Sequence, residues 1–258
     1  MPAGKCRFWL LDVNYEVVDH EPELWLWGIT EDGQRVLLID RGYLPYFYAV
    51  LEEGARPKGL LERVRAVSPL VVSAELVERR LFGRPVKTIK VVCKDPEELE
   101  KVAKKVAKLD GVKECLEEDL RFSMSYLMDK GLRPCGWHMA EVRPLDRPLE
   151  PEPQVDAVYE VVSGPEALEE HELPPLRILA FYMVAYSPRG SARPKENPVV
   201  VISVLTGDGE LRTLVAEGGD DRPVIEAFCD FVSSYDPDII FGYRSNDRLW
   251  PYLAERAR

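Results

Sequence analysis

The first forty residues alternate apolar and polar positions over short segments, a pattern typical of strands with one buried side. The alternation predicts three strands, at residues 7–18, 24–30 and 35–40. Glu31-Asp32-Gly33, between the last two, is a hairpin turn signal. We therefore expect a small antiparallel sheet at the start of the chain.

The pattern changes after Pro45 to an alternation of strands and helices. It predicts a strand at residues 46–51, a helix at 59–67 and two strands at 70–79 and 86–93. A second helix at 96–110 and a strand at 112–116 follow. The second helix is the clearest, because Asp95 is a typical N-cap residue and Glu98 would complete a capping box. This order is that of a split βαβ module, ferredoxin-like or RNA-recognition-like (RRM-like).

The chain then returns toward the first sheet and enters a second region. We expect a helix at residues 117–132 and a strand at 155–162. After Pro174-Pro175, the apolar run Leu176–Tyr186 predicts a buried central strand. The residues that follow predict a hairpin of two strands, 199–206 and 211–216, and a helix at 222–235. They then predict a buried strand at 238–243, parallel to the first, and a last helix at 246–258. This is the order of a ribonuclease-H-like domain.

These elements predict an α+β or α/β protein with three parts. A β-rich domain is formed by residues 1–44 and 117–173, and the RRM-like module, residues 45–116, is inserted into it. Residues 174–258 form the ribonuclease-H-like domain, which is incomplete.

Composition restricts the partners and the compartment. Lys and Arg number 34 against 45 Asp and Glu, so the net charge is −11, which opposes non-specific binding of the whole chain to nucleic acid. Any contact with DNA would have to be local. The five cysteines are scattered, which argues against structural zinc and disulfides and for a reducing compartment. With neither a signal peptide nor an apolar run of membrane-spanning length, we expect a cytoplasmic protein without a membrane partner.

Six short segments, taken in order, carry a resemblance to a known family. They are Leu11–Tyr15, Pro45–Ala49, Leu81–Pro85, Tyr126–Leu132, Leu179–Phe181 and Asp236–Tyr243. Together they resemble the amino-terminal and 3′–5′ proofreading-exonuclease region of archaeal family B DNA polymerases, over nearly the whole chain.

The resemblance identifies two exonuclease motifs, and both are altered. The first reads Phe-Asp-Ile/Met-Glu in the family, whose carboxylates hold Mg²⁺, but here Tyr182 and Val184 replace the acids. In the second, Arg244 stands for an Asn and Leu249 for a metal-binding Asp. Two-metal hydrolysis needs such negative ligands, so we expect no catalytic residue, no metal and no cofactor here. We interpret Asp247 as a helix N-terminal carboxylate rather than a replacement ligand.

The resemblance also implies two DNA-binding features. A pocket for a flipped base, of the kind that senses uracil in the template, would be formed by Tyr15, Pro45, Tyr46, Pro85 and Thr88. The alternative is that these prolines only turn the chain. A basic hairpin beside it would contact the DNA backbone through Arg79, Arg80, Arg84, Lys87 and Lys90. The alternative is a solvated hairpin face.

The sequence therefore predicts a non-catalytic part of a family B polymerase-like protein, related to DNA replication or repair, that binds single-stranded or template DNA. One alternative is a structural subunit that docks a separate polymerase chain or accessory protein without binding DNA. Another is an active 3′–5′ exonuclease with unusual ligands. Both a fragment of a longer protein and a short stand-alone homologue fit the sequence.

Overall fold

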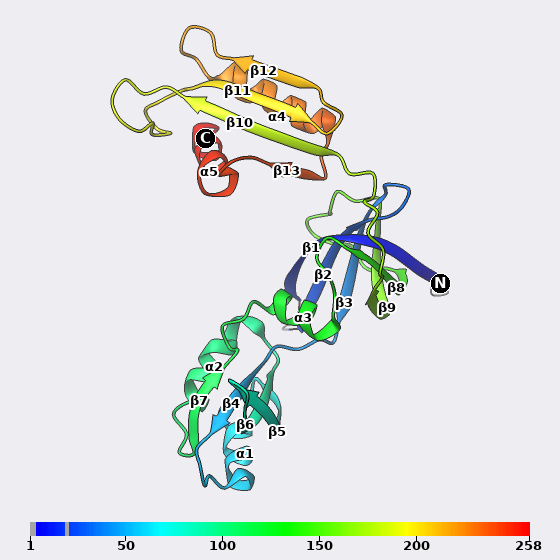
Figure 1. The fold of residues 1–258 in the computed structure, drawn as a ribbon, viewed down its shortest axis with the longest axis vertical. Coiled ribbons are helices and arrows are strands. Elements are labelled where there is room, and N and C mark those ends of the chain that lie inside the picture. The colour runs from blue at the N-terminus through cyan, green and yellow to red at the C-terminus, as the bar shows by residue number, and fades with distance from the viewer. Residues whose placement is uncertain (1–3, 19–20) are drawn as a thin grey trace. The chain divides into compact units, whose positions relative to one another are not determined.

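The computed structural model describes residues 4–18 and 21–258 of a mixed α/β, sheet-rich chain (Figure 1). The chain divides into two compact units, Met1–Pro174 and Pro175–Arg258. Each unit is described separately below. Among the described residues, no helix has the length and apolar character needed to cross a membrane.

The first unit contains a closed five-stranded barrel rather than the open sheet that we expected. Its strands, in the order in which they pair around the barrel, are β1 (Gly4–Val18), β2 (Glu21–Ile29), β3 (Arg35–Arg41), β9 (Ala157–Ala167) and β8 (Trp137–Pro144). The first three strands were predicted. Closure depends on the parallel pairing of β3 with β9, which lie more than 100 residues apart in the sequence.

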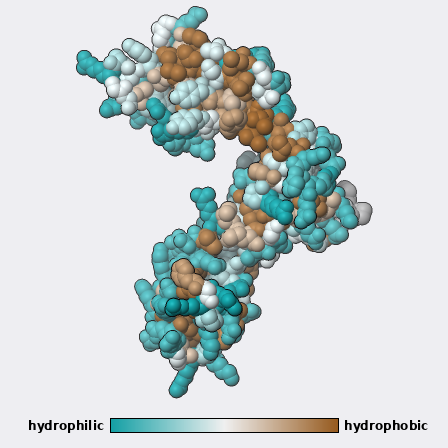
Figure 2. All heavy atoms as spheres, viewed as in Figure 1, coloured by the Kyte–Doolittle hydropathy of each residue, from teal (hydrophilic) through white to brown (hydrophobic). Residues whose placement is uncertain are grey.

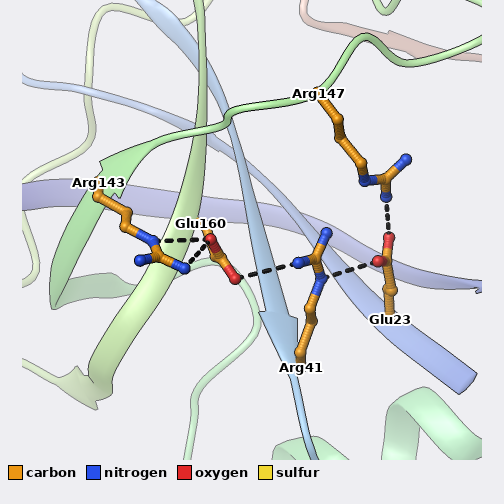
Figure 3. A network of polar contacts seen from close by, with 5 residues as sticks. All are labelled: Glu23, Arg41, Arg143, Arg147 and Glu160. Carbon is orange, nitrogen blue, oxygen red and sulfur yellow. Dashed lines mark hydrogen bonds and ion pairs between the residues drawn. The ribbon is translucent and has the colours of Figure 1, made fainter. Parts of the chain in front are cut away.

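A chain of alternating charges crosses this parallel seam (Figure 3). Arg41 lies between two carboxylates, with Nε 2.8 Å from Oε1 of Glu23 and Nη1 3.1 Å from Oε1 of Glu160. Arg143 continues the chain, with Nη2 2.7 Å from Oε2 of Glu160, and Arg147 binds Glu23. Because Glu23 is buried, it needs these cationic partners. The network ties β2, β3, β8 and β9 together.

The inserted module has the predicted order of strands and helices. Its sheet has the order β5-β6-β4-β7, formed by β4 (Tyr46–Leu51), β5 (Val71–Leu81), β6 (Arg84–Cys93) and β7 (Val112–Leu116). Two helices, α1 (Pro57–Ala66) and α2 (Leu99–Val106), pack on one face and share a core with Phe47, Ile89 and Val91.

Two local predictions in the first unit are wrong. The capping box does not form, because Asp95 accepts a hydrogen bond from the amide of Glu97 at the start of a 3-10 turn, while Glu98 binds Lys101 instead. The helix predicted at residues 117–132 is only α3 (Phe122–Lys130). Glu117 has a φ of +69°, which a right-handed helix cannot contain, and Gly131 ends α3 with a φ of +64°.

The second unit is a four-stranded sheet with the order β12-β11-β10-β13. The strands are β10 (Ile178–Ala185), β11 (Val199–Thr206), β12 (Leu211–Val215) and β13 (Ile239–Phe241). The predicted hairpin of β11 and β12 and the parallel pairing of β13 with β10 are confirmed. Helix α4 (Arg222–Tyr235) has the predicted bounds, and its apolar side chains complete the core of this unit.

Three predictions in this unit need correction. The run Leu176–Tyr186 forms a shorter strand with only one buried face, and β13 ends in Phe241, which is 54% exposed. The last helix is split into a π-helical turn, Ser245–Leu249, and α5 (Trp250–Arg256). A proline lies in the first turn of α5, and its missing amide hydrogen accounts for a break at this point.

Candidate functional site

The altered residues of the first motif lie on β10, on the sheet face opposite the core. Side chains alternate along a strand, so Phe181 and Met183 point into the core with α4. Tyr182 and Val184 point the other way and are 50% and 47% exposed. In place of two carboxylates, this face therefore carries a phenol and a branched apolar side chain.

The altered residues of the second motif are used in structural contacts. Leu249 is only 3% exposed and belongs to the core of the second unit. Arg244 has a φ of +57° and donates two hydrogen bonds to Asp247, of 2.9 and 2.6 Å. Arg244 holds the pKa of Asp247 below its usual range, and Asp247 lies in the first helical turn.

These residues do not fit a pair of divalent metal ions. Mg²⁺ takes hard oxygen ligands, mostly carboxylates, and none of Tyr182, Val184 and Leu249 carries one. Within residues 4–18 and 21–258, no three His, Cys, Asp or Glu side chains gather into a metal-binding group.

A pocket of about 620 Å³ lies between the barrel and the inserted module. Tyr15, Pro45 and Tyr46 line it, and Ser125 of α3 contributes as well. The rim is charged with both signs; its charged residues are Glu97, Glu100, Lys101, Lys104, Glu118, Asp119 and Arg121. The volume is within the range of small-molecule sites.

Hydrogen bonds and ring contacts fix the two tyrosines of this pocket. The Tyr15 ring meets Phe122 edge-on, with centroids 5.3 Å apart. Tyr46 donates to Asp129 at 2.9 Å, and Tyr43 donates to the other oxygen of the same carboxylate. Burial, followed by the contact with Asp129, raises the pKa of Tyr46, so its hydroxyl remains a donor at neutral pH.

Two of the five predicted pocket residues do not line this pocket. Thr88 is buried at 2% exposure and donates to the carbonyl of Val77 at 3.0 Å. Pro85 pairs with Arg80 near the tip of the β5–β6 hairpin. The structure therefore brings together Tyr15, Pro45 and Tyr46, but not Pro85 or Thr88.

The five predicted DNA-backbone residues all lie on the β5–β6 hairpin, but they differ in their contacts. Arg79 lies over the Tyr48 ring, 4.9 Å from its centroid, and Lys90 lies 3.8 Å from the centroid of Tyr46. Arg80, Arg84 and Lys87 have no ion pair or hydrogen bond to any described side chain, and all three are exposed. The latter three are therefore the cations available to a ligand.

Sequence reasoning did not select several residues of this region, among them Phe122, Asp129 and Phe82. Phe122 and Asp129 support the pocket tyrosines, and their spacing of seven places them on one face of a helix, which the helical pattern could have indicated. Phe82, at the hairpin tip, is 98% exposed. The sequence predicts the two strands on either side of this turn, at residues 70–79 and 86–93, but the exposure of Phe82 has no sequence signal.

Comparison with known proteins defines the class. The family model described as DNA polymerase family B, exonuclease domain, matches residues 114–258, more than half of the chain. The chain therefore belongs to DNA polymerase family B, a family of DNA replication. It corresponds to the amino-terminal and exonuclease region of the archaeal members.

Individual relatives agree along almost the whole chain. It is 36% identical to DNA polymerase 2 of Aeropyrum pernix, over 99% of this chain and 32% of that protein. It is 30% identical to DNA polymerase 3 of Saccharolobus shibatae, over 97% of this chain and 32% of that protein. The structure of the family B DNA polymerase from Pyrobaculum calidifontis matches with a TM-score of 0.81 and 44% sequence identity. The match covers 97% of this chain and 32% of that one. The chain thus spans about a third of the length of these relatives.

Proposed function

We propose that this chain is a non-catalytic, DNA-facing part of a family B polymerase-like protein in replication or repair. The observation that carries the proposal is the replacement of three carboxylates of the exonuclease motifs by Tyr182, Val184 and Leu249. Leu249 supports it most strongly, because its side chain is part of the hydrophobic core. In this proposal the exonuclease-type domain keeps its fold but has lost the residues that would bind the catalytic metal ions.

The proposal includes a finer description of the fold. We assign residues 174–258 to a ribonuclease-H-like domain and residues 45–116 to an RRM-like module, inserted into the β-rich domain of residues 1–44 and 117–173. Residues 1–3 and 19–20 of that domain lie outside the described residues. The strand orders β12-β11-β10-β13 and β5-β6-β4-β7 support these assignments.

Single-stranded template DNA is the ligand that the first unit favours. The pocket offers two tyrosines and a proline for contact with a base. The hairpin offers Arg80, Arg84 and Lys87, which form no ion pair with any described residue, for contact with phosphates. Uracil would be preferred over thymine if the pocket walls exclude the 5-methyl group. We limit the base pocket to Tyr15, Pro45 and Tyr46.

A docking role is the second candidate, and the second unit provides its observation. Apolar side chains gather on the surface of this unit (Figure 2). On the face of the sheet away from α4, cross-strand pairing arranges the exposed apolar side chains in two rows. One row contains Val184 and Val215, and the other contains Leu205, Leu211 and Phe241. A separate polymerase chain or accessory protein would bind this face.

We expect the chain to bind single-stranded DNA without degrading it. The test uses two labelled single strands that differ only in one central uracil or thymine, each incubated with the chain and Mg²⁺ or Mn²⁺. Fluorescence anisotropy should show binding, tighter for the uracil strand, and gel electrophoresis should show both strands at full length.

Each readout separates one alternative. Shortening of the 3′ end would favour an active exonuclease with unusual ligands, and the absence of any binding would favour the docking module. Equal affinities for the two strands would remove the base pocket but leave strand binding intact.

The free cations of the hairpin should determine the salt dependence of binding. Arg84→Gln with Lys87→Gln removes two phosphate contacts, so the slope of log K against log salt should become less steep by about 1.4 for single strands. The matched control is Lys105→Gln with Lys108→Gln, two cations outside the hairpin. Equal slopes for the two double variants would contradict a phosphate-binding hairpin.

A further inference from the structure

The tip of the β5–β6 hairpin extends beyond the sheet to which it belongs. Strand β4 pairs with β6 only from Val92 to Thr88, whereas β5 and β6 remain paired out to Leu81 and Arg84. The outer part of the hairpin is therefore a two-stranded ribbon. It has no third strand to stabilise it, and its tip does not contribute to the core of the module.

An aromatic side chain occupies the end of this ribbon in an unfavourable conformation. Phe82 is 98% exposed. It has a φ of +49°, followed by Gly83 with +80°. A two-residue turn with both central φ angles positive favours Asn-Gly, and a bulky residue at the first position is an outlier. Neither packing nor turn geometry explains a phenylalanine here, and such strain is commonly found at functional positions.

The hairpin tip around Phe82 is basic, although Glu78 of β5 lies opposite Lys87 across the ribbon. Residues 79–90 contain five Lys and Arg and no Asp or Glu, in a chain whose net charge is −11. Arg80 and Arg84 are each two residues from Phe82, and Lys87 follows on β6. In the described part of the chain none of these three cations forms an ion pair.

We infer that Phe82 is a stacking platform for an unpaired base of single-stranded nucleic acid, with Arg80, Arg84 and Lys87 on the adjoining phosphates. This inference rests on the proposed DNA-binding function and deepens it, because it adds a contact outside the base pocket. Exposed aromatic rings beside cations are the usual components of single-strand binding surfaces. Stacking needs an accessible π-face of a base, so it applies to single strands and not to the paired interior of a duplex.

An anionic membrane surface is the other ligand that a basic tip with an apolar residue could contact. A single strand is favoured here, because the tip carries one planar ring rather than a group of aliphatic side chains. Family membership points to DNA as well.

The test compares three single variants of the full chain with wild type. Phe82→Asn removes the ring and supplies the residue that the turn prefers, and Phe82→Tyr keeps a ring. The control, Tyr186→Asn, removes another exposed aromatic, 59% exposed, in the second unit. The probe is a fluorescein-labelled single-stranded oligodeoxynucleotide, with the same sequence as a duplex for comparison. Dissociation constants come from anisotropy, and unfolding midpoints come from urea denaturation.

Phe82→Asn should weaken single-strand binding by about 5- to 150-fold, the range expected for one stacked base. Its affinity for the duplex should be unchanged, and its unfolding midpoint should be equal to or higher than that of wild type. Phe82→Tyr and Tyr186→Asn should bind single strands like wild type. A purely structural role of Phe82 would instead lower the unfolding midpoint.

Wild-type affinity of Phe82→Asn for the single strand would overturn the inference and leave the proposed function intact. Failure of wild type itself to bind single strands would overturn both. In a last experiment, wild type and the Phe82 variants are tested for binding to vesicles of phosphatidylcholine with phosphatidylserine. Vesicle binding that depends on Phe82, with single-strand affinity independent of it, would assign the tip to membranes instead.

Discussion

The variant Leu249→Asp should unfold most of the second unit, whereas Tyr182→Asp should leave it folded. Both substitutions restore a carboxylate that the resembled exonuclease motifs contain, but the two positions have opposite environments. Leu249 is 3% exposed and lies in the core with Phe181 and Phe228. Tyr182 is 50% exposed on the open face of the sheet.

The energies differ accordingly. Removing a buried leucine side chain costs about 2–5 kcal/mol, and burying an unpaired carboxyl adds to this. We expect Leu249→Asp to lower the free energy of unfolding by about 5 kcal/mol, close to the whole stability of a unit of this size. Tyr182→Asp should cost about 1 kcal/mol, mainly through the lower strand propensity of aspartate.

Amide hydrogen exchange followed by mass spectrometry measures each unit separately. In Leu249→Asp, peptides from residues 175–258 should lose protection, while peptides from the barrel serve as an internal reference. Leu249→Met keeps the volume and should cost less than about 1.5 kcal/mol. Wild-type protection in Leu249→Asp would contradict the burial of this position, and would reopen the possibility of a carboxylate site.

Gly242→Ala should also disrupt the second unit, because the backbone leaves no room for a side chain. An ideal Cβ at Gly242 would lie 2.4 Å from the carbonyl oxygen of Phe181. That oxygen belongs to β10, so it cannot rotate away as a side chain would. The methyl group would separate the segment after β13 from β10, and the two strands share only three paired positions. We expect Gly242→Ala to lower the free energy of unfolding by about 3 kcal/mol or more.

Gly207→Ala is the matched control in the same unit. Its ideal Cβ has no neighbour closer than 3.6 Å, which is ordinary van der Waals contact, although Gly207 also lies beside β10. Urea denaturation should give Gly207→Ala a free energy of unfolding within about 1 kcal/mol of wild type. Similar losses in both variants would show that glycine is needed at these positions for reasons other than the close approach to Phe181.

Several features of this protein could be predicted from its sequence, because they depend on local periodicity. The order of elements in the inserted module follows from changes between strand and helix patterns. Helix α4 was predicted with its full bounds, from apolar residues at helical spacing. The replacement of three carboxylates by Tyr182, Val184 and Leu249 is also a property of the sequence itself.

The tertiary structure alone decided where those residues lie. Periodicity shows that a strand has two faces, but which face is covered depends on the helices that pack against it, so the exposure of Tyr182 could not be predicted. Register decided that Thr88 is buried away from Tyr46, because its partners on β4 and β5 come from other parts of the chain. Barrel closure likewise depends on the pairing of β3 with β9. The sequence by itself determined which chemical groups this protein has, and long-range pairing decided which of them meet, because contacts between distant residues leave no periodic trace.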